Sequence, residues 1–437
     1  MLELCDDREL YPMETDREAD AESGLLIDCP GSGINFLPFP VHAGTRLLPT
    51  DPERRYKLFF YTPEIPAELI HTYSYQQEAN WTTYAPDLSV LSWRTGEWIS
   101  PAEGCIRVAV QSPPEEAAIT DLFSIEPPYA GDVSVPDWMR REVDRLIERS
   151  KSCRSDGDVA LLLLTDSHYT VGGVWPDTLK SLRLAADKLH PDALVHLGDF
   201  SDGMLPGRLT RVLAERMLIQ LKEICEPLWC CLGNHDWNYF RGNPERMTRS
   251  ACARLYQGRE TPWYNVDLAD GKLRMLFMDS FDPEERDRYG FSKEQIRWLK
   301  RVLWTTPRGT KLLVFSHVPP AAEIHVWSDT IRNGEKILRI LERFHRRRGR
   351  AVLGWIHGHN HADQIYDKRA FPIIGIGCSK IEDFLEHKPE GAVTYSRQQG
   401  GETQELWDLL VIHPSKMSME FLRFGAGEDR HVELSGK

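Results

Sequence analysis

The residues that could do chemistry in this chain lie in five short polar segments, each directly after an apolar run. The segments are Thr165-Asp166-Ser167-His168, Gly198-Asp199, Gly233-Asn234-His235-Asp236, Ser316-His317 and Gly358-His359-Asn360-His361. Borderline divalent metals prefer imidazole nitrogen together with carboxylate oxygen, whereas thiolates suit softer ions. A carboxylate shared by two cations offsets part of their repulsion and holds them about 3.5–4 Å apart, the spacing that two-metal chemistry needs. The residue types therefore predict a site for two metal ions.

Alternating strands and helices are expected to position these segments. The run Val159–Thr165 is almost entirely apolar, which is typical of a strand buried on both faces. Further strands are expected at Ala193–Leu197, Leu228–Leu232, Lys311–Phe315 and Ala351–Ile356, with helices between them. Repeated βαβ units predict an α/β fold with a largely parallel core and helices outside. Because ligands bind beyond the carboxyl ends of strands in such sheets, the polar segments can converge on one edge.

The order of the motifs resembles that of the calcineurin-like metallophosphoesterase superfamily: D-x-H, G-D, G-N-H-D/E, a lone H, and G-H-x-H. The resemblance extends from Val159 to Phe424. It implies two stacked mixed β-sheets flanked by helices. It also implies the roles of nine residues: Asp166, His168 and His361 hold one metal, Asn234, His317 and His359 hold the other, Asp199 bridges both, His235 is the catalytic acid, and Asp236 orients His235.

The resemblance implies hydrolysis of a phosphate ester, either a monoester or a diester. A hydroxide bridging the two metals would attack phosphorus in line, and His235 would protonate the leaving oxygen. The two ions are expected to be manganese, iron or zinc, because all three accept this mixture of nitrogen and oxygen ligands. Two alternatives stay open: a metal-dependent nuclease, and a binding protein that has the fold without catalysis.

Two positions depart from better-defined branches of the superfamily. Purple acid phosphatases have a metal-binding tyrosine three residues after the bridging aspartate, where this chain has Asp202. The Ser/Thr protein phosphatases end the third motif with glutamate, where this chain has Asp236, and they have an arginine that is missing here. Neither an iron–tyrosinate site nor a protein phosphatase is therefore expected.

For several other residues, an ordinary structural role competes with a functional one. His196 alternates with apolar residues inside a strand, which favours a packing or hydrogen-bonding role. His357 could support the site or belong to the core, and His325 could touch substrate or lie in solvent. The run Arg346–Arg348 is expected at a helix C-terminus, where cations are favoured, so a solvated face is the better interpretation than nucleic-acid binding.

The first third of the chain is expected to fold separately. Residues 1–22 are acidic and weakly patterned, which predicts a disordered leader. Residues 23–125 contain short β-prone runs separated by Pro and Gly, which predict a small all-β, sandwich-like accessory domain. The proline-containing segment 126–136 is expected to link it to the catalytic domain, residues 137–437. The stretch Trp98–Val110 is similar to modules that precede hydrolases, which implies contact with a carbohydrate or another polymer. In this domain Trp81, Trp93 and Trp98 are expected to pack in the core rather than stack on such a ligand.

Composition excludes several classes of protein. The net charge of −13 argues against a surface that coats nucleic acid, so nucleic acid is not a favoured partner. The nine cysteines form no disulfide pattern and favour a reducing compartment. The N-terminus lacks the features of a signal peptide, and no run approaches the roughly 18 apolar residues that span a bilayer. The chain is therefore expected to be cytoplasmic, with a phosphate ester as its substrate. No G-x-S-x-G or Walker-type motif supports a serine hydrolase or an NTPase.

Overall fold

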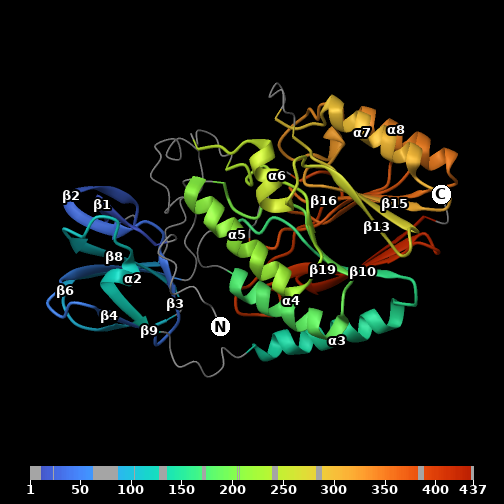
Figure 1. Ribbon diagram of the computed structural model, residues 1–437. Helices are drawn as coiled ribbons and strands as arrows, with labels where there is room; N and C mark the ends of the chain where they lie inside the picture. Colours follow the sequence, from blue (N-terminus) through green and yellow to red (C-terminus); the bar gives the residue numbers. More distant parts are fainter. Residues whose placement is uncertain are drawn as a thin grey trace.

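The computed structural model describes residues 11–22, 24–62, 87–102, 104–126, 135–169, 174–203, 205, 207–238, 245–281, 288–381 and 388–434. Figure 1 shows a β-rich N-terminal part beside a larger part in which helices flank β-sheets. This arrangement confirms the predicted fold class.

The N-terminal part consists of two antiparallel sheets that share one core. The larger sheet has the order β1 (Met13–Ala19), β2 (Leu26–Asn35), β8 (Gly104–Gln111), β5 (Tyr56–Thr62) and β6 (Asp87–Arg94), and β3 (Phe39–Val41) also pairs with β8. The smaller sheet has the order β7 (Trp98–Ile99), β4 (Arg46–Pro49) and β9 (Phe123–Glu126), and the short helix α2 (Ile119–Leu122) directly precedes β9 in the chain. Leu47 and Phe123 of the small sheet belong to the same hydrophobic cluster as Ile34 and Tyr56 of the large one.

The prediction of a disordered leader over residues 1–22 was wrong for Met13–Ala19. These residues form β1, which pairs antiparallel with β2 from Met13↔Asn35 to Ala19↔Leu26. Met13 and Ala19 are buried, while the charged residues between them are exposed or half-buried, as suits a strand at the edge of a sheet. Residues 1–10 lie outside the described part of the chain, as does Trp81. Trp98 is buried against Phe60, as the core-packing interpretation predicted, whereas Trp93 is only half-buried and does not belong to this core.

Two mixed sheets form the larger part. One has the order β12 (Leu228–Cys230), β11 (Ala193–His196), β10 (Val159–Leu164), β19 (Leu406–His413), β20 (Ser418–Gly425) and β21 (Arg430–Glu433). The other has the order β13 (Tyr264–Leu268), β14 (Leu273–Phe277), β15 (Lys311–Ser316), β16 (Val352–His357), β18 (Ile373–Gly375) and β17 (Gln364–Tyr366). Strands β10, β11 and β12 are parallel, and so are β14, β15, β16 and β18.

The apolar run of β10 is explained by its position between two layers. Leu161 and Leu163 point into a core shared with Leu313 and Phe315 of the other sheet. The alternate residue Leu162 points into a different core, built with the helices outside. Because successive side chains of a strand face opposite sides, both faces must be apolar here.

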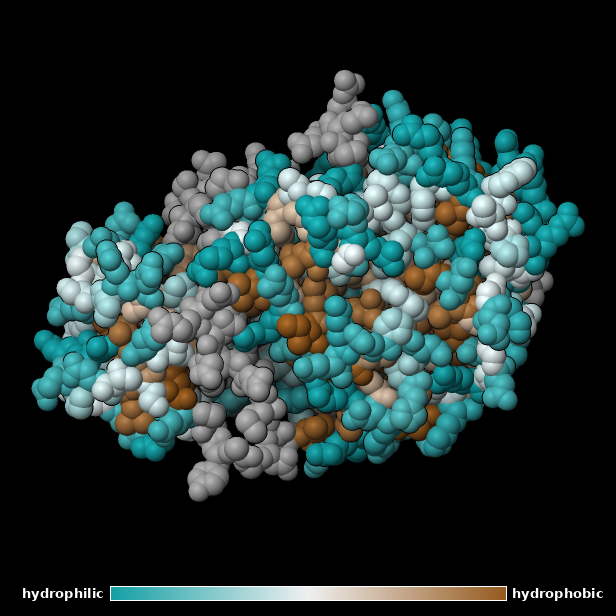
Figure 2. Space-filling model, in the orientation of Figure 1, coloured by the Kyte–Doolittle hydropathy of each residue, from teal (hydrophilic) through white to brown (hydrophobic). Residues whose placement is uncertain are grey.

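The helices cover the outer faces of the two sheets. On one side lie α3 (Asp137–Cys153), α4 (Trp175–Leu189), α5 (Gly207–Ile224) and α6 (Arg249–Gln257), and on the other α7 (Lys293–Thr305) and α8 (Gly334–Arg347). Figure 1 shows this separation. The short 3-10 helix η2 (Ala322–Ile324) lies in the loop between β15 and α8. Among the described residues, no helix combines the length and apolar character that crossing a membrane requires. The face in Figure 2 is largely hydrophilic, with small hydrophobic patches.

Helix α5 also joins the two parts of the molecule. Leu209 and Leu213 on this helix, with Leu205 just before it, belong to the hydrophobic core of the N-terminal part. Tyr169, next to His168, packs against both this core and the helix-side core of the larger part. The N-terminal part is therefore packed against the region that carries the first polar segment.

Candidate metal centre

Five candidate ligands have a backbone conformation that side chains rarely tolerate. The φ angles are 51° at Asp166, 40° at His168, 55° at Asp199, 67° at His359 and 50° at His361. A residue other than glycine is uncommon at positive φ, because its Cβ crowds the neighbouring backbone. Such strain persists only where the surrounding structure enforces it, and it gathers at functional sites.

Two glycines let the polar segments approach one another. A Cβ at Gly233 would lie 2.0 Å from Asp199 Oδ1, and one at Gly358 would lie 2.1 Å from Thr165 Oγ1. Both distances are far below contact distance and involve groups that are held in place, so a side chain at either position would push the loops apart. The glycines in the third and fifth motifs are therefore needed for the loops to meet.

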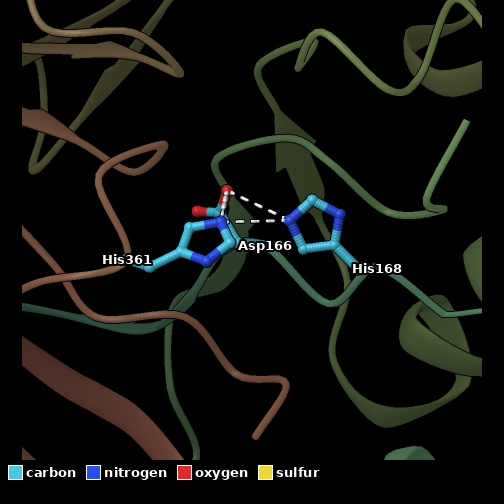
Figure 3. A group of neighbouring side chains, drawn as sticks. All are labelled: Asp166, His168 and His361. Carbon is cyan, nitrogen blue, oxygen red and sulfur yellow. Dashed lines mark hydrogen bonds and ion pairs between the residues drawn. The ribbon is translucent and has the colours of Figure 1, made fainter. Parts of the chain in front are cut away.

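The first group of side chains contains Asp166, His168 and His361, which converge from two sheets (Figure 3). Asp166 Oδ1 lies 3.1 Å from His361 Nε2 and 3.6 Å from His168 Nε2. The two imidazole Nε2 atoms are 3.1 Å apart. The other carboxylate oxygen of Asp166 accepts hydrogen bonds from Thr165 Oγ1 and from the backbone N–H of His359. Asp166 is therefore fixed, with one oxygen facing the histidines.

The second group contains Asp199, His317 and His359. His317 Nε2 lies 3.0 Å from Asp199 Oδ2, 3.1 Å from His359 Nδ1 and 3.2 Å from Asn234 Oδ1. The Nδ1–H of His317 donates to the carbonyl of Leu197, so the lone pair of neutral His317 is on Nε2, facing the group. This is the tautomer that a metal ligand requires, with the outer hydrogen bond that orients such a ligand.

Asp199 lies between the two groups. Its Oδ2 atom is 3.0 Å from His317 Nε2 and 3.8 Å from His168 Nε2. All seven predicted ligands are brought together, and none of them is more than 6% exposed. The buried set of imidazole nitrogens, carboxylate oxygens and one amide oxygen fits two borderline divalent ions.

A comparison with models of known protein families assigns part of this chain to a family. Residues 159–363 match the family model described as "Calcineurin-like phosphoesterase". This part of the chain is a calcineurin-like phosphoesterase domain. The resemblance drawn from the motifs is confirmed, and with it the prediction of a metal-dependent phosphoesterase. A comparison with curated proteins found no match.

Several solved structures are similar to the chain that carries this domain. A dimetal phosphatase from Danio rerio is 18% identical with a TM-score of 0.45, covering 63% of this chain and 99% of its own. GAP50, the anchor in the inner membrane complex of Plasmodium, is 14% identical with a TM-score of 0.38, covering 64% and 90%. A phosphopantetheinyl hydrolase from Mycobacterium tuberculosis is 12% identical with a TM-score of 0.32, covering 51% and 91%.

The carboxylates of the phosphoesterase domain create a site that favours positive charge. Burial alone would raise the pKa of Asp199, but the neighbouring His317 and His235 hold it at about 2. Burial would likewise lower the pKa of His317, but the charges of Asp199 and Asp166 raise it to about 9. Ionised carboxylates facing buried nitrogens are the electrostatic arrangement that attracts a cation.

His235 lies beside the site, but the prediction that Asp236 orients it was wrong. The Nδ1–H of the His235 ring donates to the carbonyl oxygen of Asp202, and its Nε2 atom lies 4.0 Å from Asp199 Oδ2. The carboxylate of Asp236 instead accepts hydrogen bonds from the backbone N–H groups of Gly233, Asp199 and Phe200. Burial lowers the pKa of His235 to about 4, so its imidazole is neutral at pH 7.

Of the remaining histidines of the region, two are packed in the interior and one contacts a candidate ligand. His196 is fully buried and stacks on Phe200, with Gly198 and Ser167 as hydrogen-bond partners, which is the packing role that the sequence favoured. His357 is also buried, and its Nδ1 lies 2.8 Å from the carbonyl oxygen of Gly358. His325 comes within 3.1 Å of His359, Nε2 to Nε2, and so lies against the second group.

Two aromatic residues of the site had no signal in the sequence. The ring of Tyr289 lies 5.0 Å from that of His359 and 4.7 Å from that of His325. The ring of Trp327 lies 4.7 Å from that of His359. Neither position has a spacing that relates it to the metal-binding motifs, and only the folding of the loops between β14 and α8 brings them there.

Proposed function

We propose that the protein hydrolyses a phosphate ester at a centre of two metal ions. Seven side chains would hold the ions: Asp166, His168, Asp199, Asn234, His317, His359 and His361. The observation that carries the proposal is the position of Asp199, whose carboxylate faces nitrogens of both groups. When bound, the metals supply an activated water molecule and electrostatic stabilisation of the phosphoryl oxygens.

The residues of the chain have separate tasks in this proposal. Ionised Asp166 and Asp199 provide the negative charge that binds the cations, and the buried position of the ligands keeps bulk water away. Burial is the main cause of the lowered pKa values of His235, His325 and His359, and the exposed Arg288 lies close enough for its charge to lower them further. A cation in that place favours the approach of a phosphate ester.

His235 is proposed to transfer a proton to the leaving oxygen. Its Nδ1–H is occupied by the carbonyl of Asp202, so only Nε2 can carry the transferred proton. The imidazole is neutral at pH 7 and must first be protonated, which the negative charge of a bound phosphate favours. The hydrogen bond to Asp202 holds the ring so that Nε2 stays on the side of Asp199.

The test is hydrolysis by protein loaded with manganese, with p-nitrophenyl phosphate as the monoester and bis-p-nitrophenyl phosphate as the diester. Asp199→Asn is expected to lose bound metal and to lower turnover by more than the roughly 10–100-fold typical of outer-sphere changes. Asp158→Asn is the matched control, because Asp158 is a buried carboxylate paired with His413 at 2.8 Å, away from the candidate ligands. Its turnover should stay near that of the wild type.

Measuring the number of bound metal ions tests the proposal independently of turnover. Two ions per chain in the wild type and fewer in Asp199→Asn support the proposal. A wild-type protein that binds no transition metal and hydrolyses neither substrate would contradict it, and would favour a binding protein with this fold.

A further inference from the structure

A series of buried hydrogen bonds joins three loops next to the metal centre. The backbone N–H of Gly198 donates to His196 Nδ1 at 3.1 Å, and His196 Nε2 lies 2.9 Å from Ser167 Oγ. Ser167 Oγ lies 2.9 Å from Ser379 Oγ, and the Ser379 hydroxyl donates to the carbonyl oxygen of Thr165 at 3.0 Å. None of these side chains is more than 6% exposed. We call these five residues the His196–Ser379 network.

Each bond of the His196–Ser379 network has only one possible direction. Because the N–H of Gly198 points at His196 Nδ1, that nitrogen carries no proton, and the ring proton is on Nε2. Nε2–H therefore donates to Ser167. The Ser379 hydroxyl gives its proton to a backbone carbonyl, so its oxygen accepts from Ser167. Loss of Ser379 would leave the buried hydroxyl of Ser167 without this acceptor, which is costly in the interior of a protein.

Ser379 belongs to a segment of the site that lies outside the five motifs. It follows β18, and its backbone N–H donates to the carbonyl oxygen of Thr165 at 2.9 Å. The guanidinium of Arg397 donates to the carbonyl oxygens of Cys378, Ser379 and Lys380, at 2.8, 2.8 and 2.6 Å. The backbone of Ser379 is therefore held on both sides, and its hydroxyl has a fixed position from which it meets Ser167.

The network connects the two sheets at the first group of candidate ligands. Asp166 and His168 follow β10 in one sheet, whereas His361 follows β16 in the other (Figure 3). Ser167 lies between Asp166 and His168 in the sequence, and Ser379 follows a strand of the second sheet. The bond between the two serines thus fixes the loop after β10 against the sheet that carries His361.

The second group has a different contact between the sheets. His317, which follows β15, is itself a candidate ligand, and its Nδ1–H donates to the carbonyl oxygen of Leu197 at 3.1 Å. Leu197 follows β11 in the first sheet. A ligand therefore provides the contact in the second group, whereas in the first group the network provides one through residues that are not ligands. The two groups should respond differently to loss of the network.

We propose that Ser379 and His196 are positioning residues of the first group, and that they keep His361 within reach of the ligands that follow β10. The inference rests on the proposed function, because it concerns the binding of two metal ions. Two ions act together only at a spacing of about 3.5–4 Å, so the loops that carry their ligands need a fixed separation. His196 contributes by occupying one side of the Ser167 hydroxyl, which then donates to Ser379.

The test measures manganese binding to the metal-free protein by titration calorimetry. In Ser379→Ala, one of the two ions is expected to bind about 10–100-fold more weakly, the usual effect of losing an outer-sphere partner, while the other binds as in the wild type. Electron paramagnetic resonance gives a second measurement, because two Mn²⁺ ions that share a carboxylate show exchange coupling. At a manganese concentration that fills both sites of the wild type, Ser379→Ala should show the spectrum of isolated ions.

Ser181→Ala is the matched control. The hydroxyl of Ser181 is fully buried on α4, donates to the carbonyl oxygen of Thr178 at 2.8 Å and accepts from Trp407 Nε1–H at 3.0 Å. The bonds that are lost are of the same kind as in Ser379→Ala, but α4 carries no candidate ligand. Its thermal stability should fall similarly, and both manganese ions should bind as in the wild type.

His196→Asn tests whether the two residues act through one network. The asparagine oxygen can accept from the N–H of Gly198, but no donor then reaches Ser167, whose hydroxyl can turn away from Ser379. The same manganese ion should bind more weakly. In the double variant of His196→Asn with Ser379→Ala, the loss should be no larger than in Ser379→Ala alone, because both substitutions break the same series of bonds. Losses that add would overturn the network.

The outcomes separate this inference from the function on which it rests. A Ser379→Ala variant that binds both ions as the wild type does, or that loses both equally, overturns the positioning role and leaves the phosphoesterase proposal standing. A loss in Ser181→Ala as large as in Ser379→Ala does the same. A wild type that binds no manganese and hydrolyses neither nitrophenyl substrate overturns the proposed function itself.

Discussion

Asp236 holds the backbone of Asp199 in place: its Oδ2 atom accepts a hydrogen bond from the N–H of Asp199 at 2.9 Å. The same carboxylate also accepts from Gly233 at 2.7 Å and from Phe200 at 2.8 Å. These bonds join the loop after β11 to the loop after β12, each of which carries a candidate ligand. Burial, and then the charge of Asp199, raise the pKa of Asp236 to about 7.

The first prediction concerns Asp236→Asn. An asparagine keeps one acceptor oxygen, and its NH₂ group would face a backbone N–H that needs an acceptor. We expect the variant to lose about 2–4 kcal/mol of stability and to bind metal less tightly, because the loop carrying Asp199 is released. Thermal unfolding and metal analysis measure both effects. A fully stable variant with normal metal content and low turnover would return Asp236 to the role of orienting His235.

The second prediction separates proton transfer from metal binding at His235. In His235→Asn, the side-chain NH₂ can replace Nδ1–H as the donor to the Asp202 carbonyl, while the proton-carrying Nε2 is lost. Turnover should fall by about 10²–10⁴-fold, the usual contribution of a positioned acid or base, with two metals still bound. His235→Ala should behave alike in turnover and be less stable. Loss of metal in proportion to loss of turnover would make His235 a ligand instead.

The third prediction concerns a network of buried ion pairs next to the fifth polar segment, Gly358-His359-Asn360-His361. Asp363 and Asp408 share Arg423, at 2.7 and 2.9 Å, and also share Arg430, at 2.9 and 2.6 Å. Asp363→Asn leaves buried arginines partly unpaired and should lower stability by about 3–5 kcal/mol. It should also weaken metal binding by about 10–100-fold, because Asp363 is two residues from His361.

Asp408→Asn serves as the control for this network. Asp408 pairs with the same arginines, but it lies on β19 and is far from His361 in the sequence. Its stability should fall similarly, with metal affinity close to the wild-type value in titration calorimetry. Equal losses of metal affinity in both variants would mean that the network supports the sheet as a whole and does not specifically position His361.

The fourth prediction concerns pH and lies away from the metal centre. Glu405 is buried, accepting hydrogen bonds from Thr178 at 2.6 Å and Gln404 at 2.8 Å, and burial raises its pKa to about 7 from the ordinary 4.5. Between these values the folded protein holds a proton that the unfolded chain has released. The stabilisation is therefore complete below pH 4.5 and lost as the pH rises past 7.

Glu405→Gln mimics the protonated form at every pH. Relative to the wild type, its free energy of unfolding should be higher at pH 8 than at pH 5 by an amount on the order of 3 kcal/mol. Denaturant unfolding of both proteins at the two pH values measures this difference. A difference that does not change with pH would show that the Glu405 carboxyl titrates normally in the folded protein.

Local residue patterns were sufficient for part of the fold. The unbroken apolar run of β10 predicted a strand buried on both faces, because only a strand between two layers needs apolar residues at every position. Residue patterns were insufficient for β1, because its charged residues are also typical of a disordered segment. Only the pairing with β2 identifies it as a strand. An edge strand needs few apolar residues, so its composition does not distinguish it from a disordered segment.

For the site, the sequence by itself determined the kinds of donor atoms and their order along the chain, because the residue types of the motifs specify both. Tertiary structure decided which groups touch. The carboxylate of Asp236 meets backbone N–H groups rather than His235, and Trp327 reaches His359 from a separate loop. Hydrogen bonds and ring contacts are satisfied at distances of a few ångströms between segments that are dozens of residues apart. Only the packing of the two sheets sets those distances, and spacing along the chain cannot reveal them.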